Sequence, residues 1–135
     1  MRIVLGILLV LMLLFGVVQY NDPDGLLWMM IYSVPAFWCG MAIFRKALFK
    51  YGGIMAALGF SLALCVLGVI VFWPLTPQFW TKEVWYNVET AREGMGLMIV
   101  FVVLLIVALY TGSASLLKKR LGLSKLHSGS EIHPK

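Results

Sequence analysis

Residues 94–117 read GMGLMIVFVVLLIVALYTGSASLL and contain no charged side chain. A helix that crosses a bilayer needs about twenty apolar residues, because the hydrocarbon core is about 30 Å thick and each residue advances a helix by about 1.5 Å. Three further apolar runs precede this one, at residues 3–20, 26–44 and 54–73. The sequence therefore predicts an all-α integral membrane four-helix bundle with these four runs as its spans.

The composition of the chain is that of a membrane protein. Of its 135 residues, 61% are hydrophobic and 13% are charged, and the mean hydropathy is +0.93. So little polar surface could not cover a water-soluble globule of this size. We expect residues 1–117 to form the transmembrane domain and residues 118–135 to form a flexible basic cytoplasmic tail. The expected partners are the lipid bilayer and a membrane protein or a second copy of the chain.

The basic residues predict how the chain is oriented. Lys and Arg in short loops are retained on the cytoplasmic side of a membrane. Of the eleven basic residues, only Lys82 and Arg92 fall on the side opposite to the N-terminus. This bias places both termini in the cytoplasm, and we expect the membrane to be the inner (plasma) membrane of a bacterium. The basic residues flank the apolar runs and do not alternate with aromatic residues, so no nucleic-acid partner is expected.

The sequence lacks the residues that several kinds of chemistry require. His127 and His133 both lie in the tail, so no imidazole within a span could ligate haem. Cys39 and Cys65 lie in different apolar runs without a CxxC neighbour, which is typical of small packing residues. No nucleotide-binding loop is present, and no acidic residue lies at the centre of a span. We therefore expect no cofactor and no enzymatic activity. Whether the chain binds a metal ion is left open by the sequence.

The first polar motif that could carry a function lies between the first two runs. It contains Asn21, Asp22 and Asp24. Each residue suits a structural role at the start of the second span: Asp22 as N-cap, Pro23 at the first helical position and Asp24 in the first turn. On this interpretation Asp22→Ser would be nearly silent, and Asp22→Ala would cost about 1 kcal/mol.

The second polar motif precedes the fourth run. Thr90 and Glu93 have the spacing of a capping box, while Glu89, Arg92 and Glu93 can share one helical face. Because both motifs lie at the same expected depth, we expect Asp24, Glu89 and Glu93 to converge with Arg92. Such a group could bind a cation, a lipid head group or a partner. The alternative is a small membrane enzyme or transporter that uses the carboxylates of Asp24, Glu89 and Glu93.

The chain resembles a family of small four-helix membrane proteins, the transmembrane protein 220 family. The likeness spans most of the chain and rests on three groups of residues: Gln19 to Asp24; Trp28, Tyr32, Pro35 and Ala36; and Glu89, Arg92, Glu93, Gly96 and Leu97. The resemblance implies a four-helix membrane domain. It carries no established activity that could be transferred.

Overall fold

The computed structural model describes residues 1–73 and 81–129, and within these every side chain except those of residues 85, 86, 89, 90 and 113–129. All of the described elements are helices. In chain order they are α1 (Arg2–Val18), η1 (Gln19–Asn21), α2 (Gly25–Phe44), η2 (Lys46–Lys50), α3 (Gly52–Val71), α4 (Lys82–Asn87) and α5 (Glu89–Gly129).

The described part of the chain holds four helices that are long and apolar enough to cross a membrane. They cover Arg2–Asn21, Gly25–Phe44, Gly52–Val71 and Ala91–Gly112. Helices suit this environment, because in lipid each backbone N–H and C=O needs a partner within the protein and a helix supplies these partners within one segment. The all-α prediction with four membrane spans is thus confirmed. The cytoplasmic location of the two termini stays a prediction.

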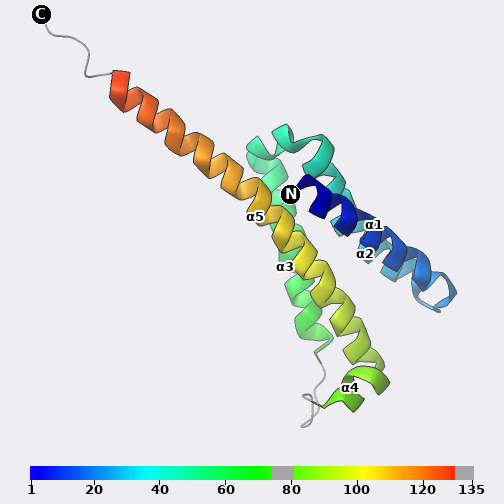
Figure 1. Cartoon of the computed structure of the whole chain (residues 1–135). Helices are drawn as coiled ribbons and strands as arrows, with labels where there is room; N and C mark the ends of the chain where they lie inside the picture. The colour runs from blue at the N-terminus through cyan, green and yellow to red at the C-terminus, as the bar shows by residue number, and fades with distance from the viewer. Residues whose placement is uncertain (74–80, 130–135) are drawn as a thin grey trace, which may run out of the picture.

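The four long helices are arranged as two antiparallel pairs. Helix α1 packs along α2, α3 packs along α5, and the contact between α2 and α5 joins the pairs (Figure 1). The pairs diverge toward the end of the molecule that carries η1 and the start of α5. We call this the η1 end. The core lies between α2 and α5, where Ala36 and Cys39 of α2 and Val103 and Val107 of α5 are buried together.

Small side chains allow α3 to approach the other helices. The Trp38 indole Nε1–H donates a hydrogen bond to Ser61 Oγ at 3.1 Å, which links α2 to α3. The Cys65 thiol donates to the Leu97 backbone carbonyl at 3.2 Å, which links α3 to α5. Both cysteines are buried and unbridged, as their positions in apolar runs predicted.

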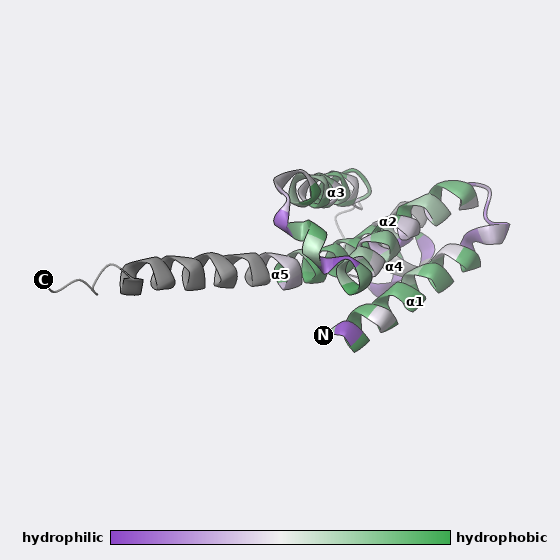
Figure 2. Cartoon of the chain, turned by 90° about the horizontal axis from the view of Figure 1, so that it is seen from above, coloured by the Kyte–Doolittle hydropathy of each residue, from purple (hydrophilic) through white to green (hydrophobic). Residues whose placement is uncertain are grey.

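The outer surface of the four helices is apolar. Hydrophobic residues run along the helices, while hydrophilic residues gather at their ends (Figure 2). Most of the large apolar side chains of α1 and α3 are exposed, which in a membrane protein is the surface that meets lipid. Helix α5 continues past the predicted end of the fourth span at Leu117 and projects beyond the other helices to Gly129. That residues 118–135 form a flexible tail stays a prediction.

Candidate functional site

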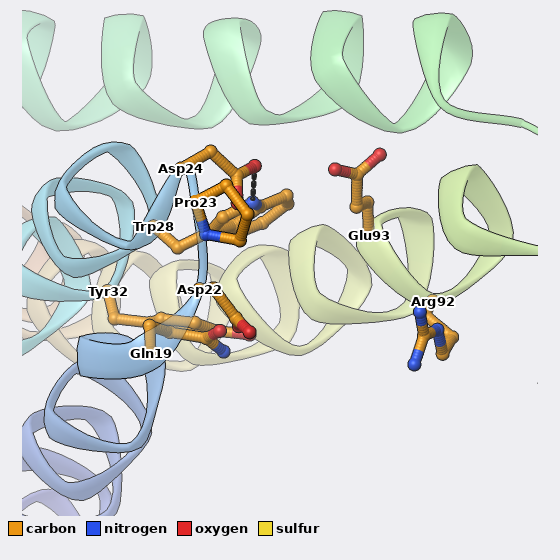
Figure 3. A pocket seen from close by; sticks show the side chains of 8 residues that line it. All are labelled: Gln19, Asp22, Pro23, Asp24, Trp28, Tyr32, Arg92 and Glu93. Atoms are coloured by element: carbon orange, nitrogen blue, oxygen red, sulfur yellow. Dashed lines mark hydrogen bonds between the residues drawn. The ribbon is translucent and has the colours of Figure 1, made fainter.

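A pocket lies at the η1 end, between the turn that joins α1 to α2 and the start of α5. Its volume is about 270 Å³. The residues that line it are Gln19, Asp22, Pro23, Asp24, Trp28, Tyr32, Arg92 and Glu93 (Figure 3). The two polar motifs, which are far apart in the sequence, therefore line one cavity.

The structure brings together four of the six residues proposed from the sequence. Asp22, Asp24, Arg92 and Glu93 all line the pocket, whereas Asn21 is exposed outside it. The remaining member, Glu89, is the first residue of α5, and its side chain lies outside the described part of the structure. In Figure 3, Asp24 and Glu93 lie along one side of the cavity and Asp22 and Arg92 along the other. The pocket thus presents acids on both sides and a single guanidinium.

The turn that carries the first motif is built around Gly25. The Asp22 N–H donates to the Gln19 carbonyl at 3.1 Å, and the Gly25 N–H donates to the Asp22 carbonyl at 3.0 Å. The chain thereby folds back so tightly that a Cβ on Gly25 would overlap the Gln19 carbonyl oxygen. Glycine at this position lets Asp22 and Asp24 face the start of α5.

The capping role expected for Asp22 is wrong. Helix α2 begins at Gly25, and its N-cap position is occupied by Asp24, whose side chain makes no capping bond. The Asp24 carboxylate instead accepts a hydrogen bond from the Trp28 indole Nε1–H at 2.7 Å. Because Trp28 is only 5% exposed, its N–H needs a partner inside the protein. That need decides where the carboxylate points, and the basis for the expected 1 kcal/mol cost of Asp22→Ala is removed.

We expect Asp24→Ala to lower the free energy of unfolding by about 1–3 kcal/mol, because the buried indole N–H would lose its acceptor. Asp24→Asn should cost less, since its amide oxygen can accept the same bond. Asp22→Ala serves as the control and should change stability by no more than about 0.5 kcal/mol, as exposed substitutions commonly do. Unfolding of the purified protein in detergent measures all three. An equal loss from Asp22→Ala and Asp24→Ala would contradict the assignment.

The capping box expected at Thr90 and Glu93 is also wrong. Helix α5 begins at Glu89, so Thr90 already lies inside it and cannot be its N-cap. The first turn is fixed by Val88, whose carbonyl accepts from the N–H groups of Ala91 at 3.1 Å and Arg92 at 3.2 Å. Helix α5 therefore begins before the apolar run that starts at Gly94. In the first turns of this helix Arg92 is exposed and Glu93 is half-buried.

Aromatic side chains form the floor of the pocket. Trp28 and Tyr32 are both buried, and their ring centroids lie 6.2 Å apart. Trp28 also packs edge-on against Phe72, the residue that follows α3, with ring centroids 6.2 Å apart. Tyr32 packs edge-on against Phe15 of α1 at 5.7 Å. Trp28 and Tyr32 belong to the residues that carry the family resemblance, but they were not predicted as site residues. Their spacing of four residues on one face of α2, beginning next to Asp24, was the available signal.

The described side chains of residues 1–73 and 81–129 contain no group of three or more His, Cys, Asp or Glu that could hold a metal ion.

One comparison with known proteins gives a match. The family model for transmembrane family 220 covers residues 11–109. The chain belongs to transmembrane family 220. Every residue that lines the pocket lies within the matched range, and the resemblance predicted from the sequence is confirmed. Neither the curated proteins nor the solved structures give a match.

Membership of transmembrane family 220 identifies the chain as a polytopic integral membrane protein and assigns no activity to it. It also gives no support to the expectation of a bacterial inner membrane, so the compartment stays a prediction.

Proposed function

We propose that the chain is a membrane-embedded binding protein whose pocket takes the positively charged group of a polar ligand. The observation that carries the proposal is the pocket itself, which Asp22 and Asp24 from one motif line together with Arg92 and Glu93 from the other. The residues that line the pocket carry three carboxylates and one guanidinium, so their summed formal charge is negative. A cation in the cavity would be attracted by that charge.

The aromatic floor supports binding at this end of the molecule. Trp28 and Tyr32 line the pocket and pack into the buried core behind it. The oxygen acceptors in the cavity wall come from Gln19, Asp22, Asp24 and Glu93.

The asymmetry of the basic residues supports a pocket that opens on the non-cytoplasmic side. The loops at the opposite end carry Arg45, Lys46 and Lys50, the residue types retained in the cytoplasm. With this orientation a ligand reaches the pocket from outside the cell or from the lumen of an organelle.

The experiment uses ethanolammonium chloride as a probe and sodium chloride at equal ionic strength as the reference. The melting temperature of the purified protein in detergent should rise by a few degrees as the probe saturates the pocket, because a ligand that binds only the folded state stabilises it. In the Asp24→Asn, Glu93→Gln double variant this rise should vanish. A second arm labels a cysteine placed at Pro23 with a membrane-impermeant thiol reagent in intact cells, and labelling is expected there.

The matched control is Glu83→Gln on α4, which removes an exposed carboxylate outside the pocket. This variant should keep the full response to the probe. No response in the parent, or an equal loss in the Glu83 variant, would overturn the proposed function. Protection of the cysteine at Pro23 would overturn the orientation.

A further inference from the structure

The pocket adjoins a second cavity of about 290 Å³, with which it shares Gln19, Tyr32 and Arg92. Its remaining lining residues come from two helices, Phe15 and Val18 from α1 and Met95, Gly96 and Ile99 from α5. We call this second cavity the α1–α5 groove. It leads from the polar pocket down between the two helices.

The groove opens on the surface that meets lipid. Val18 is 75% exposed and Ile99 is 42% exposed, and both lie in segments apolar enough to cross a membrane. Helix α1 packs mainly on α2 and touches α5 far less. The side of α1 that faces α5 therefore leaves space for a bound ligand. An elongated apolar group could enter this groove sideways from the bilayer.

The two cavities present their chemistry in a fixed order. The acids Asp22, Asp24 and Glu93 line the pocket alone, Arg92 stands where pocket and groove meet, and Ile99 belongs to the groove alone. From the pocket to the groove, negatively charged side chains are followed by a positively charged side chain and then by apolar side chains. A ligand that complements it must be positive, then negative, then apolar.

We propose that pocket and groove together hold one phospholipid with a primary ammonium head group, of the phosphatidylethanolamine class. Its ammonium lies among Asp22, Asp24 and Glu93, its phosphate pairs with Arg92, and an acyl chain lies in the α1–α5 groove. This inference rests on the proposed function and names its ligand. Arginine suits the junction, because its guanidinium matches a phosphate with two parallel hydrogen bonds.

Two other common head groups fit less well. A primary ammonium donates three hydrogen bonds, and the carboxylates together with the Gln19 amide supply oxygen acceptors for them. A trimethylammonium has no N–H to donate and needs aromatic faces around it, but Trp28 is packed against Phe72 and Tyr32. A glycerol head group brings no positive charge for the acids.

The experiment offers the detergent-purified protein an equimolar mixture of dioleoyl phosphatidylethanolamine, phosphatidylcholine and phosphatidylglycerol. Because the acyl chains are identical, only the head group can discriminate. Native mass spectrometry then counts each lipid that remains bound. Phosphatidylethanolamine should exceed each of the others by about tenfold, which corresponds to about 1.4 kcal/mol. The Asp24→Asn, Glu93→Gln variant should lose the preference over phosphatidylcholine, and Arg92→Gln should reduce phosphatidylethanolamine binding.

The acyl chain is tested with two tryptophan substitutions on α5. Ile99→Trp fills the groove and should reduce bound phosphatidylethanolamine severalfold. Val102→Trp is the control, since Val102 is 52% exposed on the same helix and does not line the groove. Both positions are accessible enough for the larger side chain to be accommodated on the surface.

Equal retention of the three lipids, or an equal effect of Ile99→Trp and Val102→Trp, would overturn this inference. If ethanolammonium still raises the melting temperature of the parent, the proposed function stands without the lipid. If neither the soluble probe nor phosphatidylethanolamine binds, the proposed function and the lipid inference are both wrong.

Discussion

Replacement of Gly25 by alanine is expected to lower the free energy of unfolding by about 3 kcal/mol or more and to deplete folded protein in the membrane. The added Cβ would overlap the Gln19 carbonyl oxygen and approach the Gln19 carbonyl carbon to 3.1 Å. Both are backbone atoms, so no side chain can rotate away. The same oxygen accepts the Asp22 N–H, so any movement that relieves the overlap also opens the turn. Such overpacking belongs to the most costly class of small substitutions.

The chain offers a matched control for this prediction. Gly59 lies inside α3, and a Cβ added there meets no atom within 4 Å. Gly59→Ala should therefore leave stability unchanged or raise it by up to about 1 kcal/mol, because alanine is the better helix former. Unfolding in detergent and the yield of folded protein measure both variants. Equal behaviour of the two would show that the turn at Gly25 is not as tight as described.

The second large effect is expected at Gly96, where α5 crosses the floor of the pocket. A Cβ at this position would lie 2.6 Å from the Tyr32 hydroxyl oxygen and 3.5 Å from Trp28 Cζ3. Tyr32 is only 6% exposed, so its ring cannot turn aside without displacing its neighbours. Gly96→Ala should cost about 1–3 kcal/mol. It should also weaken the response to ethanolammonium, because the floor moves.

A double-mutant cycle tests the cause of this effect. Tyr32→Phe removes the hydroxyl that the new methyl group would meet and keeps the ring. In the Gly96→Ala, Tyr32→Phe protein, much of the lost stability should therefore return, which gives a coupling energy of about 1 kcal/mol or more. Strictly additive losses would mean that the contact between Gly96 and Tyr32 does not limit the packing of α5 on α2.

The four spans could be predicted from the sequence because the bilayer imposes their length, and each helix satisfies its own backbone. The shared location of Asp24 and Glu93 could also be predicted, since two turns on the same side of a membrane lie at the same depth. Residue types at helix starts proved less informative. Asp22 and Thr90 have ordinary capping spacing, yet neither occupies an N-cap position.

What decided these positions was the tertiary structure. The carboxylate of Asp24 turns to Trp28 because that indole N–H is buried, and its burial depends on how α2 packs against α5 and against Phe72. The α1–α5 groove was equally beyond the sequence. It depends on how far two helices separate, and hydrophobic runs such as those around Val18 and Ile99 do not encode that separation.

The hydrogen bond between Asp24 and Trp28 has a consequence for biosynthesis. Both residues belong to the start of α2, so the bond can form as soon as the α1–α2 hairpin has entered the membrane. The indole N–H then has its partner before the ribosome has made α5. The pocket, in contrast, is incomplete until Arg92 and Glu93 are translated and α5 docks. The nascent hairpin thus already satisfies the buried indole N–H, whereas the residues of the pocket come together only after α5 has docked.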